Sequence, residues 1–218
     1  ARASAKRGMK VIAITDHSVS LGETGGLSME RHKEQAKEIK KIQKQLGDSI
    51  LVLHASEVEI KADGTLDYPD EFLASLDLVV ASLHTSLRQP REKVTQRVIN
   101  AIRNPHVDII GHPTGRLIQE REDADLDMEA VLNAAAETGV AMEINAHPAR
   151  LDLDDLHARR AKELGIPIAL NTDAHSEEDL DMLPYGVATA RRAWLTKNDV
   201  INCWSQDKLL KWLKKRGK

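Results

Sequence analysis

Six residues of the types that bind divalent metal ions each follow a short apolar run in this chain. They are four histidines and two carboxylates: His17, Glu57, His84, His112, Asp173 and His175. Imidazole and carboxylate without thiolate is the ligand set of zinc, iron or manganese. A single histidine after a strand is more often a hydrogen-bonded core residue, but six such groups in series indicate a metal site. They exceed what one tetrahedral ion needs, so we expect two or more ions.

The spacing of these residues suggests individual roles. Asp173 and His175 are separated by one residue just after an apolar run, so their side chains should project to one side. Glu57 has two carboxylate oxygens and is the best candidate to bridge two ions. We therefore expect Glu57, Asp173 and His175 to be catalytic. In a multi-metal site a metal-bound water deprotonates near neutral pH and attacks phosphorus, while the ions stabilise the attacking and leaving oxygens.

Arginines follow several of the candidate ligands. Arg88 and Arg91 come after His84, Arg116 comes after His112, and Arg150 lies further along the chain, after His147. A guanidinium group can grip a phosphate through two parallel hydrogen bonds, so we expect these four arginines to bind substrate. Ordinary surface arginine is the alternative and should account for at least one of them. The sequence contains no Gly-x-Ser-x-Gly motif and no phosphate-binding glycine loop, so phosphoester hydrolysis is the favoured chemistry.

The apolar runs themselves predict the strands that would position this site. Short, unbroken and rich in β-branched residues, they are typical of strands buried on both faces of a parallel sheet. Polar residues at the carboxyl ends of such strands lie where α/β folds place their chemistry. The predicted strands cover residues 11–14, 51–58, 78–82, 109–111, 141–144 and 168–171.

Helical periodicity separates the strands. The predicted helices cover residues 28–46, 68–76, 90–103, 127–138, 153–164 and 206–215, with Ser28 and Pro69 as start signals and Gly139 and Gly165 as stop signals. This alternation predicts parallel strands joined by right-handed crossovers, in a barrel. Six strands are few for a closed barrel. Residues 1–10 have the composition of a helix end, so we expect a further strand upstream of Ala1.

The five remaining histidines are weaker candidates for the site. His32, His106 and His157 are expected to be solvated, and His54 and His147 are secondary candidates for the site.

The chain has 218 residues, a net charge of −3, 3% aromatic residues and one cysteine, so we expect a single domain in the cytoplasm. This composition does not favour a base-stacking platform, and no apolar run is long enough to span a membrane. The amphipathic helix at 206–215 should pack on the barrel.

Six motifs in order resemble the PHP (polymerase and histidinol phosphatase) domain. They are Ile-Thr-Asp-His-Ser (14–18), Ser-Glu-Val-Glu-Ile (56–60), Ala-Ser-Leu-His (81–84), Gly-His-Pro-Thr-Gly-Arg (111–116), Glu-Ile-Asn-Ala (143–146) and Asn-Thr-Asp-Ala-His (171–175). Residues 64–70 and 104–108 most resemble the PHP domain at the C-terminus of bacterial and archaeal family X DNA polymerases. The resemblance covers residues 1–218 as one domain.

The resemblance implies a distorted seven-stranded (β/α) TIM-like barrel with three metal ions, which would be zinc, manganese or iron. On that template His17, Glu57, His84, His112, Asp173 and His175 fall on ligand positions. Two departures matter. The family's first strand, with a His-x-His pair and a further histidine, is absent from this sequence, so the domain is expected to be N-terminally truncated and weak in metal binding. Ala55 also replaces the glycine that usually precedes the bridging glutamate.

Three functions follow from the resemblance. The leading hypothesis is a metal-dependent phosphoesterase that acts as the 3′–5′ exonuclease and DNA repair module of a family X polymerase, with DNA 3′ ends as substrate and a polymerase domain upstream. The second is a stand-alone phosphatase on a small phosphate monoester, of the histidinol phosphatase type. The third is a catalytically silent structural domain. A silent domain should have lost ligands by substitution, and none of the six positions is substituted, which favours an enzyme.

Overall fold

A parallel six-stranded sheet organises the computed structural model, which describes residues 1–21 and 25–215. Its order follows the chain, from β1 to β6. The strands are β1 (Val11–Ile14), β2 (Leu51–Glu59), β3 (Leu78–Ser82), β4 (Ile109–Gly111), β5 (Ala141–Asn145) and β6 (Ile168–Asn171). Every neighbouring pair is parallel. The predicted strands and their parallel pairing are therefore confirmed, with β2 and β5 each one residue longer than predicted.

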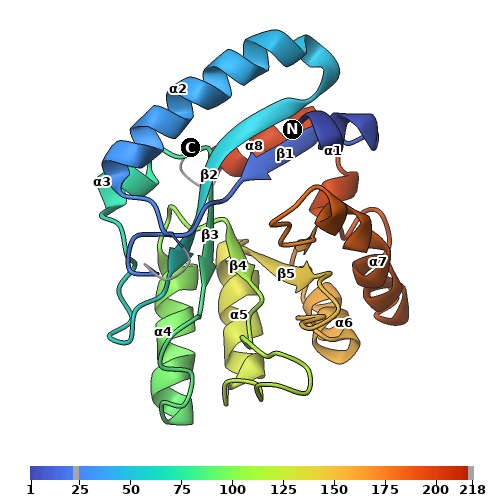
Figure 1. Ribbon diagram of the computed structural model, residues 1–218. Coiled ribbons are helices and arrows are strands. Elements are labelled where there is room, and N and C mark those ends of the chain that lie inside the picture. The colour runs from blue at the N-terminus through green and yellow to red at the C-terminus, as the bar shows by residue number, and fades with distance from the viewer. Residues whose placement is uncertain (22–24, 216–218) are drawn as a thin grey trace.

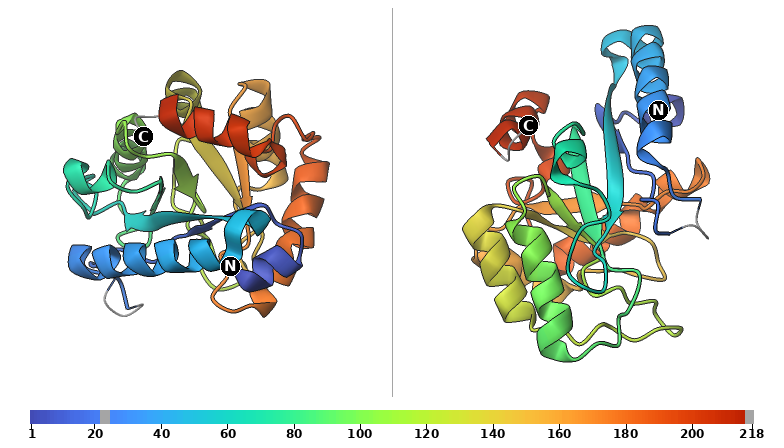
Figure 2. Two further views of the ribbon diagram at one scale, coloured as in Figure 1. Left: turned by 90° about the horizontal axis from the view of Figure 1, so that it is seen from above. Right: turned by 90° about the vertical axis from the view of Figure 1, so that its left-hand side faces the viewer.

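The sheet curls, and helices cover its outer face (Figures 1 and 2). The covering helices are α4 (Arg91–Arg103), α5 (Met128–Thr138), α6 (Asp155–Glu163) and α7 (Leu183–Arg192), while α2 (Met29–Leu46) lies along β2. Strands β1 and β6 are the two edges, so the described sheet forms part of a barrel. The α/β class and the barrel-like curvature agree with the sequence prediction, and the seventh strand stays a prediction.

Two apolar clusters pack against the two faces of the sheet. The larger one fills the space between the sheet and α4, α5 and α6, with Val79, Val98, Val131 and Ile144 fully buried. The smaller one joins inward-facing strand residues such as Val80 to helix α8 (Gln206–Lys215) through the buried Leu213. The amphipathic C-terminal helix thus packs on the sheet, as predicted. None of the described helices combines the length and the apolar character that a membrane span requires.

The predicted helices occur, with shorter ends in several cases. Helix α1 (Arg2–Lys6) precedes β1, and α3 (Asp70–Leu73) is only one turn long. The Ser28 side chain caps α2 by accepting a hydrogen bond from the backbone of Arg31, and Gly139 ends α5 in the left-handed conformation. Helix α7 was not predicted. Its Gly186 weakens the helical pattern, yet a Cβ at this position would lie 2.8 Å from that of Ala146, so close packing on β5 requires the glycine.

One prediction about a histidine is wrong. His32 was expected to be solvated, but its side chain is fully buried beneath α2, among His54, Tyr68 and Phe72. The ring centroids of His32 and Phe72 are 5.4 Å apart. The polar neighbours of His32 along α2 concealed this burial, because its apolar surroundings come from β2 and α3. Burial and the neighbouring His54 lower the pKa of His32.

This buried histidine predicts a loss of stability in acid. The pKa of His32 is lower in the folded protein than its ordinary value of 6.5, so below about pH 6.5 the unfolded chain binds more protons than the folded one. Stability should therefore fall as the pH falls through this range. Replacement by phenylalanine, which fits the aromatic surroundings, should reduce that fall. Urea unfolding at pH 8 and pH 5 measures the difference, with His106→Gln as the control. An unchanged pH dependence in His32→Phe would contradict the assignment.

Candidate metal centre

The carboxylate of Glu57 lies at the centre of three histidine side chains. Its oxygen Oε2 is 3.3 Å from Nδ1 of His17, and its oxygen Oε1 is 3.4 Å from Nε2 of His84 and 2.9 Å from Nε2 of His112. One ligand atom each of His17, Glu57 and His84 lies within 4.8 Å of the others. Glu57 is 7% exposed. This group could hold a metal ion.

The strand ends bring these four residues together. His17 pairs with Glu57 in a parallel bridge just beyond the end of β1, and His84 follows β3 on the other side of β2. His112 follows Gly111, the last residue of β4. A Cβ on Gly111 would lie 2.4 Å from the Ser82 hydroxyl, so only glycine allows β4 to approach β3 this closely. The three imidazoles then stand edge to face, with ring centroids 5.1 Å and 4.9 Å apart.

The second carboxylate of β2, Glu59, orients His84. Glu59 and Glu57 lie two residues apart and therefore share a face of the strand. Glu59 lies 2.7 Å from Nδ1 of His84 and accepts hydrogen bonds from the backbone of His84 and from both the backbone and hydroxyl of Thr85. A proton on Nδ1 leaves the Nε2 lone pair free to face Glu57. A carboxylate that fixes a histidine tautomer in this way is typical of histidine ligands to metals.

The charges of this cluster stabilise one another. Burial acts to raise the pKa of Glu57, but the neighbouring rings of His112 and His84 outweigh it and hold that pKa well below its usual range. Burial also acts to lower the pKa of His84, and the carboxylates of Glu57 and Glu59 reverse this and raise it to about 9. Burial is the largest influence on the pKa of His17 and lowers it. The cluster therefore concentrates negative charge between imidazoles that could donate lone pairs to a cation.

The donor atoms of this cluster fit a divalent ion. Among the ring nitrogens of the described residues that are buried and make no hydrogen bond are Nδ1 of His17, Nε2 of His84 and Nε2 of His112. All three lie next to the Glu57 carboxylate. Buried polar atoms without partners are costly, and a metal ion would satisfy them. The set of imidazole nitrogens and carboxylate oxygens suits zinc, iron or manganese.

Asp173 and His175 lie on the His17 side of the cluster. Asp173 has a positive φ of 54°, and its carboxylate accepts a 3.1 Å hydrogen bond from the side chain of Asn145. His175 is 2.7 Å through Nδ1 from the backbone oxygen of Asp173. Its ring centroid is 6.2 Å from that of His17, and its side chain is 70% exposed. The structure thus brings all six predicted ligands to one edge of the sheet, with His175 at the solvent.

Two buried residues of β5, Glu143 and Asn145, support the centre and were not among the predicted ligands. Glu143 accepts a hydrogen bond from the backbone of His112 and another from the side chain of Asn171. Burial raises the pKa of Glu143 to about 7. Asn145 holds Asp173, as described above. The alternation in Glu-Ile-Asn places both side chains on one face of β5, and the same signal in Glu-Val-Glu could have identified Glu59.

The four predicted arginines occupy different positions. Arg150 lies closest to the centre, with Nε 3.6 Å from Asp173 and a side chain that is 15% exposed. Arg116 donates to the backbone oxygens of Arg150 and Leu151 and so supports the loop that carries Arg150. The other two are over half exposed and form ion pairs with acidic residues, Arg88 with Glu122 and Arg91 with Asp125.

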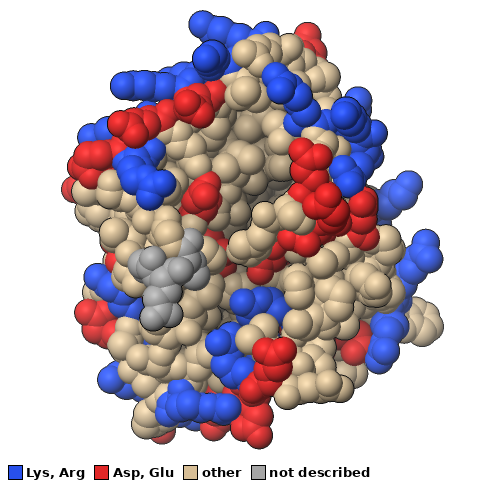
Figure 3. Space-filling view, in the orientation of Figure 1, with Lys and Arg blue, Asp and Glu red and all other residues tan. Residues whose placement is uncertain are grey.

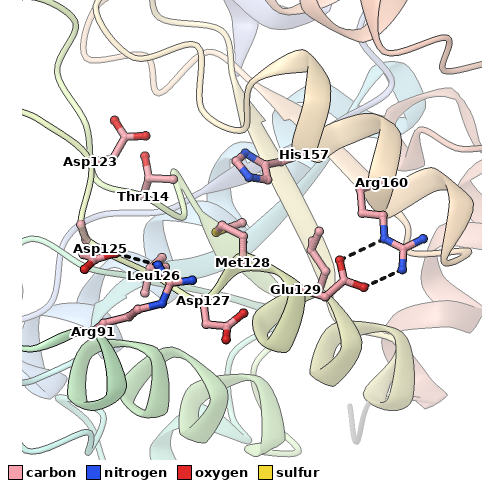
Figure 4. Close-up of a pocket in the computed structure, with 12 residues that line it drawn as sticks. Arg91, Thr114, Asp123, Asp125, Leu126, Asp127, Met128, Glu129, His157 and Arg160 are labelled. Carbon is pink, nitrogen blue, oxygen red and sulfur yellow. Dashed lines mark hydrogen bonds and ion pairs between the residues drawn. The ribbon is translucent and has the colours of Figure 1, made fainter.

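A separate cavity of about 560 Å³ lies outside the sheet, between the beginnings of α4, α5 and α6 (Figure 4). Arg91 lines it together with His157, Arg160 and a series of acidic side chains, and none of the six candidate ligands does. Arg91 thus faces a different recess from Arg150. Its role in binding substrate stays a prediction.

Comparisons with known proteins found two kinds of relative. No family model matches the chain. It is 43% identical over 215 residues to a DNA polymerase/3′–5′ exonuclease PolX from Bacillus subtilis (strain 168), covering 99% of this chain but 38% of that protein. It is 32% identical over 212 residues to a protein named "probable phosphatase" from Thermoanaerobacter sp. (strain X514), covering 93% of this chain and 81% of that protein.

A solved structure supports the same fold. The crystal structure of histidinol phosphate phosphatase from Lactococcus lactis subsp. lactis Il1403, complexed with zinc, L-histidinol and phosphate, matches with a TM-score of 0.61. The match covers 89% of this chain and 86% of that one, at 17% identity.

The contacts of Glu59 generate a prediction about metal affinity. Glu59→Gln keeps the shape of the side chain but removes the charge that holds His84. Loss of such a supporting carboxylate should weaken metal binding roughly 10–100-fold. Competition with a metal-sensitive dye would measure zinc and manganese affinity. Glu71→Gln, an exposed change on α3, is the matched control. Equal affinity in Glu59→Gln and the control would show that Glu59 does not support a metal ligand.

Proposed function

Because the chain belongs to the PHP (polymerase and histidinol phosphatase) family of metal-dependent phosphoesterases, we propose that it hydrolyses phosphate esters at the cluster around Glu57. The metal ligands in this proposal are His17, Glu57, His84, His112, Asp173 and His175. The observation that carries it is the buried Glu57 carboxylate with three imidazoles around it, each with an unsatisfied ring nitrogen. The proposed cofactor is a group of divalent ions, and three ions is the number that the family resemblance implies.

The chain's own residues would position the reaction. Divalent ions, when bound, supply electrophilic stabilisation of phosphoryl oxygens and a nucleophilic water at neutral pH. Arg150 would hold a phosphate oxygen opposite the cluster, since its guanidinium group lies beside Asp173 and is mostly buried. Asn145 holds the Asp173 carboxylate, and Glu59 holds the His84 ring. Fixed ligands matter because displacements of about 0.5 Å already impair catalysis.

The proposed substrate is the 3′ end of DNA. It is supported by the relative with a 3′–5′ exonuclease in its name, which is 43% identical over 99% of this chain, a higher identity than the 32% of the probable phosphatase. The chain spans 38% of the length of that PolX relative, so a partner polymerase domain is part of the proposal. Zinc is one candidate ion, because the structurally similar histidinol phosphate phosphatase was crystallised with it. The seventh strand, which would pair with the edge strand β1, also belongs to this proposal.

A second candidate function is hydrolysis of a small phosphate monoester. It is favoured by the named phosphatase relative, of which the chain covers 81%, and by the fold shared with the histidinol phosphate phosphatase. The same cluster and Arg150 would serve this reaction. The two functions differ in whether the substrate continues beyond the reacting phosphate.

Removal of Asp173 should abolish hydrolysis. In the native full-length chain, Asp173→Ala should lower metal-dependent release of 3′ nucleotides or 3′ phosphates by at least roughly 100-fold, because a carboxylate ligand both binds the ion and balances its charge. His175→Ala should have nearly the same effect. Activity would be followed with end-labelled DNA in manganese and, in parallel, with p-nitrophenyl phosphate.

These assays need one control variant, and two results would count against the proposal. His106→Ala, in the turn after α4, should leave both activities unchanged. Efficient cleavage of p-nitrophenyl phosphate without any action on DNA would favour the small-molecule phosphatase. Full activity in Asp173→Ala would mean that the ligand assignment is incorrect. The 218-residue chain assayed alongside would show whether it contains all the groups that catalysis needs.

A further inference from the structure

A group of three arginines extends outward from the candidate metal centre. We name it the arginine row: Arg150, Arg121 and Arg88. Arg150 lies 3.6 Å from Asp173, and Arg88 is 62% exposed at the opposite end. Arg121 lies near both of them: its side chain donates to the backbone of Gly115, which packs against Leu87, and Ile118 in its turn bonds to Ala149. Burial, followed by these two like charges, lowers the pKa of Arg121. Three positive charges thus stand on neighbouring loops, one of them beside Asp173 and one exposed to solvent.

The local backbone holds Arg121 in this position. Leu117 and Arg121 pair in an antiparallel bridge that closes a tight turn after Gly115. Two guanidinium nitrogens of Arg121, Nε and one terminal nitrogen, donate to the backbone oxygen of Gly115 at 2.9 Å and 2.7 Å. Ile118 in the same turn donates to the backbone of Ala149, next to Arg150. The turn therefore fixes Arg121 relative to Arg150 before any ligand binds.

The arginine row retains unused hydrogen-bond donors. Within residues 1–21 and 25–215, the Nη1 group of Arg121 and the Nη2 group of Arg150 make no hydrogen bond. Arg88 has an ion pair with Glu122 alone, and that partner is 88% exposed. An exposed ion pair of this kind is weak and exchanges readily for another anion. Basic side chains also gather beside a recess near the middle of the face shown in Figure 3.

We propose that Arg121, together with Arg88, binds a second phosphate of the substrate, next to the one that Arg150 holds at the metal centre. The row therefore selects a polynucleotide 3′ end, in which phosphates repeat along the chain, over an ester with one phosphate. This inference rests on the proposed phosphoesterase function. Among the described residues Arg121 has no carboxylate partner, and the only partner of Arg88 is exposed, so both guanidinium groups can take up a second phosphate of a repeating anion. An isolated monoester would leave Arg121 and Arg88 without a ligand.

The test measures binding of a fluorescein-labelled oligothymidylate by fluorescence anisotropy across a range of salt concentrations, with calcium in place of a catalytic metal. Arg121→Gln should weaken binding roughly 10–100-fold, as expected for lost hydrogen bonds to a charged group. The slope of log affinity against log salt should fall by about 0.7, the value for one phosphate contact on a single strand. Arg121→Lys should restore much of the slope, because it keeps the charge.

Two further variants make the test specific. Arg103→Gln removes the same charge at the far end of α4 and is the matched control, with no expected change in slope. Arg88→Gln should also reduce the slope, and it leaves the hydrogen bonds to Gly115 intact. It therefore keeps the proposal testable if Arg121→Gln destabilises the turn. In the native full-length chain, Arg88→Gln should lower kcat/KM on oligothymidylate more than kcat/KM on thymidine 5′-(p-nitrophenyl phosphate), which has one phosphate.

The opposing outcomes separate this inference from the proposed function. Unchanged slopes in both Arg121→Gln and Arg88→Gln would overturn the second-phosphate site, even if the native enzyme cleaves DNA. Thymidine 3′,5′-bisphosphate that competes as tightly as the oligonucleotide would overturn the choice of a polynucleotide in favour of a small diphosphorylated substrate. A native enzyme that binds oligothymidylate with the expected slope but hydrolyses no phosphate ester would support the site and contradict the proposed function.

Discussion

The burial of one carboxylate, Glu57, is the constraint on which the rest of the site depends. A carboxylate with 7% exposure is stable in its charged form only if its surroundings replace the lost water. The three imidazoles around Glu57 do so, and those of His112 and His84 hold its pKa well below the usual range despite burial. Those imidazoles come from three different strand ends, so the charge of Glu57 and the curvature of the sheet are coupled. A sheet that lost its curl would leave the carboxylate buried without partners.

A second group of buried polar side chains stabilises the first. Glu59 and Glu143 are buried and accept hydrogen bonds from the backbone or ring of His84 and His112. Their burial is costly by itself, and burial raises the pKa of Glu143 to about 7. The hydrogen bonds that these two carboxylates accept offset the cost of burying them. The arrangement fixes the histidine rings before a metal binds, so little conformational freedom is left to lose on binding.

The sequence predicted the strands closely because their signals are local. Unbroken apolar runs defined six parallel strands, and the polar residues after them lie at one edge of the sheet, as the parallel topology requires. Features that depend on distant parts of the chain were harder. His32 carries polar neighbours along α2 but is buried by residues of β2 and α3. Arg121 lies in a turn without periodicity, and only the fold brings it near Arg150.

The contrast between strand and loop residues indicates how this fold can acquire different substrates. The Glu57 cluster stands on strand ends whose neighbours are tightly packed, as the close approach at Gly111 shows, and few substitutions there would be tolerated. The arginine row stands on the loops after β3, β4 and β5, where changes cost little stability. Under the proposed function, the strand ends would therefore set the chemistry, and the loops would decide which phosphates reach it.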